Sequence, residues 1–580
     1  MSLRVVALLG LFLGSLVTSV LTADQNWWRH AIVYQVYPRS YKDSNGDGVG
    51  DLKGILSKLD HIKDTGAAAF WISPINRSPM VDFGYDVSNF TDIDPIYGTL
   101  ADFEDLIAQA NSVGLKIILD FVPNHSSTQH EWFQKSVKRI KPYDEYYVWK
   151  DAKVVDGKRY PPNNWLSIFS GTAWEWNEER QQYYLHQFGP TQADLNYRSS
   201  YLNQEMKNAL QFWLERGIGG FRIDAANFMF EDSQFLDEPP SNITGLTPGD
   251  SDSLDHIYTQ NLQQTYEVIK SWRELLNEYA KEHDTDLKLM LTEVYAPIND
   301  VTKYYRYGVN VPFNFMFVTG LNNQSTAADF KKSIDTWIDN IPSGDYMPNW
   351  VVGNHDNPRA ATRFGTLRAD QTSILAMTLP GVAVVYNGDE IGMEDTDVSW
   401  EDTVDPSGLS AGPIQYKIKS RDPERTPFQW DDTKDAGFST ASKTWLPINP
   451  NYKTLNLAAE EKAPVSHYSV FKDLVKLRKL PVLQNGSLEN VLVTDSVLGI
   501  VRRLKDSPPV VILVNFSDSP TVVDAQSKLE IPQELSVYTA SVYSKIQAGS
   551  PVDTSKLSLP GAASVVLSTP ELIKEVQTLS

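Results

Sequence analysis

An arginine and an aspartate follow each other closely in residues 220–227, Gly-Phe-Arg-Ile-Asp-Ala-Ala-Asn, where an apolar run typical of a buried strand ends. Because alternate residues of a strand point the same way, the side chains of Arg222 and Asp224 project together. A positive neighbour lowers the pKa of a carboxyl group and keeps it ionised, as a nucleophile requires. A structural ion pair in an α/β core would explain the same octapeptide. Other residues of the chain are needed to distinguish a catalytic site from such a pair.

Other ionisable side chains stand at the ends of further apolar runs: Asp120, His125, Glu293, His355 and Asp356. Together with Asp224 and Arg222 they would form an acid/base constellation. Carboxylates brought together raise the pKa of at least one of them, which allows a protonated general acid near neutral pH. A di-metal hydrolase is the alternative, but it would more usually show His-x-His or additional ligands.

The elements that must position these side chains alternate between strand-like runs and segments of helical periodicity. We expect eight strands, at residues 31–37, 68–73, 115–122, 220–224, 289–295, 314–317, 350–356 and 382–386. This order predicts an α/β fold, a (β/α)₈ TIM barrel with its active site at the carboxyl ends of the strands. An open doubly wound sheet is the structural alternative.

Two stretches depart from the alternation. Residues 126–196 are rich in Trp, Tyr, Pro and Asn and show little periodicity, which predicts an inserted B domain after the third strand. From Asn485 onward, short β-rich runs separated by turn residues predict a C-terminal all-β sandwich domain. The predicted division is therefore a signal peptide at 1–23, the barrel at 24–125 and 197–484, the B domain at 126–196 and the β-sandwich at 485–580.

The N-terminus and the composition bear on location and partners. Arg4 precedes an apolar run at residues 5–21, which is typical of a secretory signal peptide; an uncleaved membrane anchor is the alternative. Glycosylation sequons fit a secreted, extracellular glycoprotein; they begin at Asn76, Asn89, Asn124, Asn242, Asn323, Asn485 and Asn515. The net charge of -21 argues against nucleic acid or acidic membranes as partners. Neutral or cationic ligands remain open. Trp and Tyr are abundant (15 and 27), and their flat apolar faces suit sugar rings, although such residues more often form the core.

Residues 43–51, Asp-Ser-Asn-Gly-Asp-Gly-Val-Gly-Asp, place oxygen atoms at alternate positions of a glycine-rich loop. Hard cations prefer such oxygen ligands. The predicted structural calcium site takes side-chain oxygens from four residues and a backbone carbonyl from a fifth: Asp43, Asn45, Asp47, Asp51 and Val49. The order resembles an EF-hand loop, but Gly54 stands where the terminal glutamate would be. An acidic surface turn is the alternative.

Several of these segments resemble the signature regions of the α-amylase superfamily, glycoside hydrolase family 13: residues 120–125, 220–224, Glu293 within Leu-Thr-Glu-Val, 354–356 and 381–390. Residues 192–196 resemble a region that marks the oligo-1,6-glucosidase and α-glucosidase branch. Residues 82–86 and 420–427 are similar to insect maltases. The resemblance covers nearly all of the chain after the signal peptide.

This resemblance implies a retaining, exo-acting α-glucosidase (maltase), with Asp224 as nucleophile, Glu293 as general acid/base and Asp356 as transition-state stabiliser. The substrate-binding residues that it implies are Asp82, Tyr85, His125, Arg222, His355 and Arg421. Arg421, rather than Arg425, would hold the non-reducing end of the sugar together with Asp82. The loop at 43–51 matches the calcium-binding loop of the family.

The residue after the implied nucleophile, Ala225, bears on which glycosidic linkage the enzyme prefers. In this branch it is typically Val in α-1,6 enzymes and smaller in α-1,4 enzymes; here it is Ala225, so we expect maltose and sucrose over isomaltose. The alternatives are a non-catalytic receptor or transporter-subunit relative, and a sucrose-isomerising or transglycosylating enzyme. An endo-acting amylase fits less well, because Asp82 and Arg421 would block one end of the cleft. Non-catalytic relatives lose catalytic carboxylates, whereas all three are present here.

Overall fold

The computed structural model describes residues 23–246 and 249–579. The predicted signal peptide, apart from Ala23, lies outside the described residues. Within the described part of the chain, no helix is long and apolar enough to cross a membrane.

Eight parallel strands form the central sheet, in the order β15-β14-β13-β5-β2-β1-β17-β16. They are β1 (Ile32–Val36), β2 (Ala69–Ile72), β5 (Lys116–Phe121), β13 (Gly220–Ile223), β14 (Leu289–Thr292), β15 (Val311–Pro312), β16 (Asn349–Val351) and β17 (Val382–Tyr386). Their residues are almost all buried, as expected for parallel strands covered on both faces. The predicted (β/α)₈ barrel is confirmed.

A side chain bridges the two terminal strands of this sheet. The Asn349 amide nitrogen donates a hydrogen bond to the Pro312 carbonyl at 2.6 Å, and its amide oxygen accepts one from the Asn314 backbone at 2.8 Å. Asn349 is fully buried, so these bonds satisfy polar groups that have no water to bind. Strands β15 and β16 are thereby tied together and the barrel is nearly closed.

The sixth strand differs from its prediction at residues 314–317. The structure places β15 at Val311–Pro312 and a short helix, α9, at Met316–Thr319. The Asn314 side-chain oxygen accepts a hydrogen bond from the Met316 backbone at 3.1 Å. Such a local bond favours a turn over an extended chain, so the aromatic residues here are buried without being in a strand.

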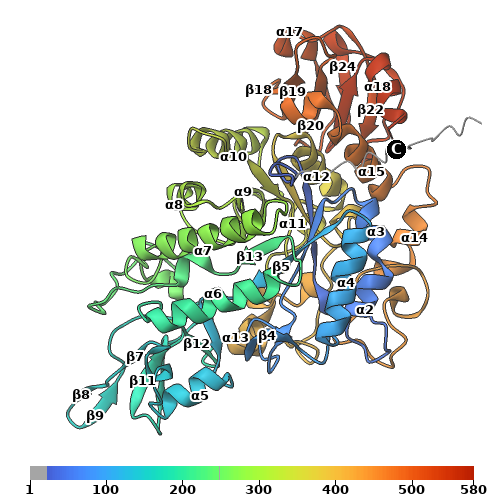
Figure 1. Cartoon of the computed structure of the whole chain (residues 1–580). Helices are drawn as coiled ribbons and strands as arrows, with labels where there is room; N and C mark the ends of the chain where they lie inside the picture. The colour runs from blue at the N-terminus through green and yellow to red at the C-terminus, as the bar shows by residue number, and fades with distance from the viewer. Residues whose placement is uncertain (1–22, 247–248, 580) are drawn as a thin grey trace, which may run out of the picture.

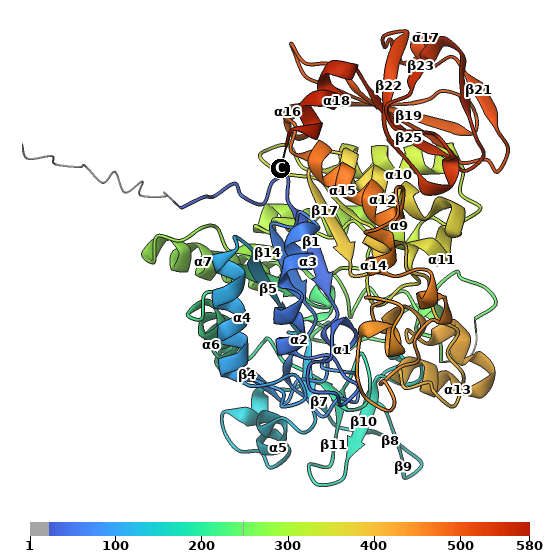
Figure 2. The same ribbon diagram turned by 90° about the vertical axis from the view of Figure 1, so that its right-hand side faces the viewer.

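Helices cover the outside of the barrel, as Figures 1 and 2 show. They include α2 (Leu52–Ser57), α3 (Leu59–Asp64), α4 (Leu100–Ser112), α6 (Ser200–Leu214), α7 (Gln263–Glu282), α8 (Ile298–Lys303), α10 (Ala327–Asn340), α12 (Ala369–Thr378) and α15 (His467–Arg478). In α7, Tyr266, Ile269, Trp272 and Leu276 are buried at helical spacing and form the face that packs on the barrel. Helices α4 and α10 both begin with a capping box, Thr99 with Asp102 and Thr326 with Asp329.

The segment between β5 and α6 projects from one end of the barrel (Figure 1). It contains α5 (Glu131–Val137) and the strands β6 (His125–Ser127), β7 (Trp149–Lys150), β8 (Lys153–Val155), β9 (Lys158–Tyr160), β10 (Trp174–Asn177), β11 (Gln182–Leu185) and β12 (Gln192–Asp194). Strand β12 pairs antiparallel with β6, so that Asp194 lies opposite His125. This pairing brings the end of the segment back to the carboxyl end of β5.

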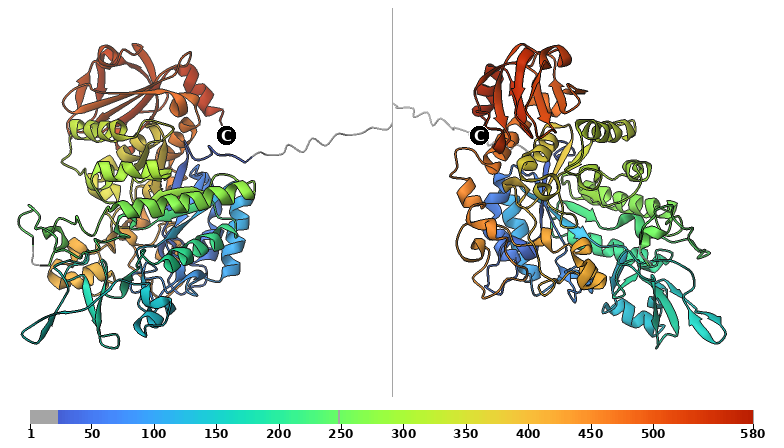
Figure 3. Two further views of the ribbon diagram at one scale, coloured as in Figure 1. Left: turned by 60° about the vertical axis from the view of Figure 1, so that its left-hand side comes forward. Right: turned by 180° about the vertical axis from the view of Figure 1, so that it is seen from behind.

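The C-terminal part lies at the opposite end of the molecule (Figures 1 and 3). Its main sheet is antiparallel: β18 (Ser487–Leu492), β19 (Val497–Arg503), β20 (Val510–Asn515), β25 (Ser564–Ser568), β22 (Glu534–Ala540) and β23 (Pro551–Asp553), in that order. Strands β21 (Thr521–Val523) and β24 (Leu557–Leu559) form a second sheet, and helices α17 (Ala525–Leu529) and α18 (Pro570–Gln577) are added. Phe516 stacks on Phe330 of α10 with ring centroids 4.3 Å apart, which anchors this part to the barrel.

Candidate active site

The predicted catalytic side chains meet at the carboxyl ends of the barrel strands. Asp224 directly follows β13, Glu293 directly follows β14, and Asp356 lies beyond the end of β16. They line one pocket of about 490 Å³, together with Tyr85 and His125. Since the barrel fixes the spacing of its strands, side chains that are far apart in the sequence are held close together.

Arg222, on β13, connects the carboxylates of this pocket. One of its terminal nitrogens donates to Asp120 at 3.0 Å and also contacts Asp224, while the other lies 2.9 Å from a Glu293 oxygen. Its guanidinium lies over the Trp71 ring at 4.6 Å and is 1 % exposed. The Arg222–Asp224 pair is therefore not an isolated ion pair: one buried cation is shared by three carboxyl groups.

Burial gives Asp224 and Glu293 unusual acidities. It raises the pKa of Asp224 to about 6, although the Arg222 charge opposes the change. Burial raises the pKa of Glu293 to about 8, again against Arg222, and the negative charges of Asp224 and Asp356 raise it further. The expectation that Arg222 leaves Asp224 with a lowered pKa was wrong, because desolvation outweighs the ion pair. Between these two values Asp224 is ionised while Glu293 keeps its proton.

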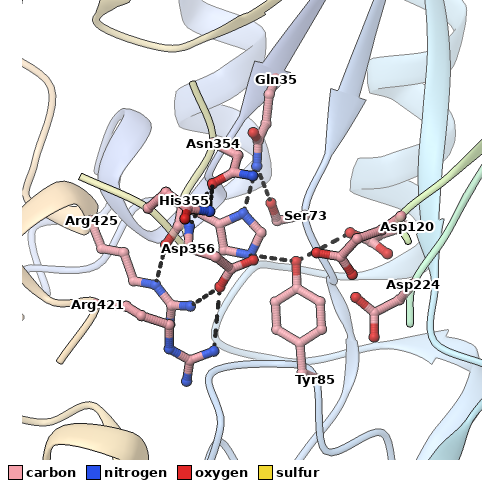
Figure 4. A network of polar contacts seen from close by, with 12 residues as sticks. Gln35, Ser73, Tyr85, Asp120, Asp224, Asn354, His355, Asp356, Arg421 and Arg425 are labelled. Carbon is pink, nitrogen blue, oxygen red and sulfur yellow. Dashed lines mark hydrogen bonds and ion pairs between the residues drawn. The ribbon is translucent and has the colours of Figure 1, made fainter. Parts of the chain in front are cut away.

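The pKa of Asp356 is shifted in the opposite direction. Burial acts to raise its pKa, but neighbouring His355 and the guanidinium groups of Arg425 and Arg421 outweigh it and hold the pKa below the ordinary value. Arg425 donates to Asp356 at 2.7 Å and Arg421 at 3.3 Å, as Figure 4 shows. Arg421 also contacts Asp82 at 2.8 Å, which places these two residues together as predicted. The sequence prediction gave Arg425 the lesser role and missed its contact with Asp356.

A hydrogen-bonded chain fixes His355. The Gln35 amide donates to Nδ1 of His355 at 2.8 Å, Nε2 of His355 lies 2.6 Å from the Tyr85 hydroxyl, and that hydroxyl donates to Asp120 at 3.2 Å (Figure 4). The His355 ring stacks with the rings of Tyr85 and Tyr37, with centroids 5.3 Å apart in each pair. Burial keeps the pKa of His355 well below its ordinary value, so the imidazole is neutral and its Nε2 carries the proton.

The projecting segment supplies a wall of the pocket through Gln192 on β12. Its side-chain nitrogen lies 3.1 Å from an Asp82 oxygen and 3.1 Å from Nε2 of His125. Burial lowers the pKa of His125 to about 4, so this imidazole is also neutral. Gln192 belongs to the segment 192–196 that the sequence analysis singled out, but it was not predicted as a site residue.

Ala225 lines the same pocket in a left-handed conformation, with φ 42° and ψ 42°. Its backbone N–H donates to Glu293 at 3.2 Å. A non-glycine residue in this region costs on the order of 1–3 kcal/mol, and a β-branched side chain fits it worse than alanine does. The backbone therefore disfavours valine here independently of any contact with substrate.

The predicted calcium loop is folded around its own carboxylates. Asp43 accepts hydrogen bonds from the backbones of Asn45, Gly46 and Gly48 at 2.7–3.0 Å, and Asp51 caps α2 through Gly54 at 2.8 Å. Among residues 23–246 and 249–579, no group of three or more His, Cys, Asp or Glu side chains is placed to hold a metal ion. The donors at Asp43, Asn45, Asp47, Val49 and Asp51 are all oxygen atoms, which is the chemistry that calcium takes, so the set fits in type and the site stays a prediction.

Comparison with known proteins shows which family this chain resembles over most of its length. The family described as "Alpha amylase, catalytic domain" matches residues 35–486. Maltase 1 of Drosophila virilis is 50 % identical, with 90 % of this chain and 83 % of that protein covered. The α-glucosidase of Apis mellifera is 48 % identical, covering 93 % and 94 %. A salivary α-glucosidase of Anopheles gambiae is 44 % identical, covering 93 % of each.

Among solved structures, an α-glucosyl transfer enzyme, XgtA, is similar with a TM-score of 0.81 and 33 % identity. The match covers 94 % of this chain and 99 % of that one. The likeness therefore extends over the barrel, the projecting segment and the C-terminal sheets.

Proposed function

Because the chain belongs to the α-amylase family, glycoside hydrolase family 13, and is an α-glucosidase, we propose that it removes single glucose units from maltose, sucrose and short malto-oligosaccharides. The observation that carries this proposal is the pocket in which Asp224 and Glu293 share the Arg222 guanidinium. The ion pair of Asp82 with Arg421 lines the same pocket. Such a pair closes one end of the pocket and favours attack on the non-reducing end of a chain.

The mechanism is a double displacement with retention. Ionised Asp224 attacks the anomeric carbon while protonated Glu293 gives its proton to the departing glycosidic oxygen. Glu293, now a carboxylate, then takes a proton from water, which attacks the anomeric carbon and releases Asp224. Both carboxyl groups contact the same Arg222 guanidinium, and this closeness supports retention, since inverting enzymes keep them roughly 6.5–9.5 Å apart to admit a water molecule.

The other side chains hold the sugar and stabilise charge. Asp356 stays ionised, so it can bind ring hydroxyls and stabilise the positive charge that develops on the sugar. Neutral His125 lines the pocket and hydrogen-bonds hydroxyl groups without adding charge. His355 does not line the pocket, and both of its nitrogens are engaged by Gln35 and Tyr85, so its role is to position Tyr85. The Tyr85 ring offers a flat apolar surface to one face of the glucose.

A substrate panel tests this function. We expect kcat/KM for maltose to exceed that for isomaltose at least tenfold, and Ala225→Val to reduce the ratio by about tenfold, since one or two methylene groups in a pocket discriminate by that order. Ala225→Gly is the matched control, because glycine tolerates the left-handed backbone. Faster hydrolysis of isomaltose than of maltose by the wild type would contradict the linkage proposal. Conversion of sucrose mainly to an isomeric disaccharide would favour the sucrose-isomerising alternative.

We further propose that calcium binds the loop at 43–51, with Asp43, Asn45, Asp47, Val49 and Asp51 as ligands and a structural role only. A ligand that binds only the folded state stabilises it, by about 2.7 kcal/mol at a hundredfold excess over its Kd. EDTA should therefore lower Tm, and calcium should restore it while magnesium restores less. The control is Asp47→Asn, which should weaken the calcium response. A Tm that is equal with EDTA and with calcium would refute the site.

We propose that the protein is secreted, because its N-terminal residues 5–21 form an apolar leader and because one of its relatives is a salivary α-glucosidase. N-terminal sequencing of protein from the culture medium should begin near Asp24; retention of the leader would contradict it.

A further inference from the structure

A second cavity, of about 590 Å³, adjoins the catalytic pocket. Apolar and aromatic side chains from the end of β14, from α8, α9 and α10, and from the segment after β15 make up most of its lining. Phe313, Phe315, Leu321 and Trp337 are among them. Apolar surface of this kind binds apolar ligand surface in preference to water.

Tyr295 lines both cavities and so forms the wall between them. Its ring stacks on Phe315 with centroids 4.4 Å apart, and its hydroxyl accepts hydrogen bonds from Asn354 and Asn357 at 3.1 and 3.0 Å. Tyr295 is two residues beyond Glu293, which in the proposed mechanism protonates the leaving group. The second cavity therefore adjoins the leaving-group side of the pocket.

One buried polar atom in the lining has no partner. Nε1 of Trp337 makes no hydrogen bond among the described residues, and this side chain is 1 % exposed. A buried donor left unpaired is destabilising, and a ligand oxygen within reach would relieve that cost. Thr319, Ser333 and Thr336 are the other uncharged polar residues of the lining, and Asp329 and Lys332 on α10 add one charge of each sign. The cavity thus suits a ligand that is largely apolar, and an oxygen atom on such a ligand would find a donor in Trp337.

We propose that this second cavity is an extended leaving-group subsite for the apolar aglycones of α-glucosides, with the aglycone passing over Tyr295. The inference rests on the proposed function, because only a glucoside bound at Asp224 and Glu293 places its aglycone on this side. Occupation of the cavity lowers the energy of the transition state for such substrates, so it raises kcat/KM for long apolar aglycones over short ones.

The test compares octyl and methyl α-glucoside, each below its critical micelle concentration. For the wild type we expect kcat/KM to be at least about tenfold higher for the octyl compound, a factor that burial of only two of its seven additional carbons would supply at about 0.8 kcal/mol each. Thr336→Trp fills the cavity from α10 and should bring the ratio close to one, with maltose hydrolysis unchanged. Ser333→Phe is a second filling variant, should the first fail to fold. Lys331→Trp, on α10 outside the lining, is the matched control and should keep the wild-type ratio.

The outcomes of this test distinguish a failure of the subsite proposal from a failure of the proposed function. Equal kcat/KM for the two glucosides in the wild type, or an unchanged ratio in both filling variants, would overturn the subsite while maltose hydrolysis still supports the proposed function. A filling variant that impairs maltotriose and spares octyl glucoside would identify a sugar as the occupant and overturn the apolar assignment. A wild type that hydrolyses neither maltose nor methyl α-glucoside would contradict the proposed function, and the subsite with it.

Discussion

Replacing Asp224 by asparagine is expected to lower kcat for maltose on the order of 10⁴-fold or more, because the amide cannot form the glucosyl ester. The fold should tolerate the change. Burial raises the pKa of Asp224 to about 6, above the unfolded value of roughly 3.9, so its ionised form lowers stability as the pH rises toward 6 and the cost persists at neutral pH. The variant loses that cost, while Arg222 keeps Asp120 and Glu293 as partners. We therefore expect Tm at pH 7 to be unchanged or higher.

Asp194→Asn is the matched control for this experiment. Asp194 is buried, burial raises its pKa to about 7, and its carboxylate binds Gln187 outside the pocket lining. If burial of a carboxylate were all that mattered, both variants would lose activity alike. We expect the control to keep kcat within a few-fold of the wild type. A kcat for Asp224→Asn within tenfold of the wild type would remove Asp224 from the mechanism.

Replacing Glu293 by glutamine is expected to reduce kcat/KM for maltose by about 10²- to 10⁴-fold, the usual contribution of a general acid. The loss should be much smaller for formation of the covalent intermediate from 4-nitrophenyl α-glucoside, whose leaving group needs no proton. Azide, which attacks without a general base, should restore turnover of this aryl glucoside. Equal losses on maltose and on the aryl glucoside, without rescue by azide, would indicate a structural rather than an acid/base role.

The pH dependence of kcat/KM provides a second test of Glu293, again with the variant Glu293→Gln. In the wild type, kcat/KM should fall below about pH 6, where Asp224 takes up a proton, and above about pH 8, where Glu293 loses its proton. These limits belong to the interacting pair of groups. Glu293→Gln should lose the alkaline limb and keep the acid one. Persistence of the alkaline limb in this variant would assign it to another group.

The barrel and the catalytic carboxylates were predictable because each rests on a local pattern. Asp224 and Glu293 directly follow buried apolar runs, and the alternation of strands and helices brings such ends together. The sixth strand was misplaced because residues 314–317 are buried like a strand but turn at Asn314. Burial alone does not distinguish a strand from a short helix.

The features of the site that were not predicted from the sequence depend on contacts that no local pattern encodes. Gln35 lies within an apolar strand and reaches His355, 320 residues away. Arg425 could not be placed on Asp356 from its sequence position, because residues 357–424 between them include α12, β17 and further helices, and no local pattern predicts how these pack. The direction of the Asp224 pKa shift depends on whether desolvation or the Arg222 charge is larger, and that balance requires the degree of burial.

The central claim is that Asp224 forms a covalent bond with glucose, and trapping that intermediate tests it most directly. In Glu293→Gln, α-glucosyl fluoride should still react, because fluoride leaves without a proton, while hydrolysis of the product lacks its general base. Mass spectrometry of the digested protein should then find glucose on the peptide that contains Asp224. An adduct on Asp120 or Asp356 instead, or turnover of the fluoride with no adduct on any carboxylate, would contradict the mechanism.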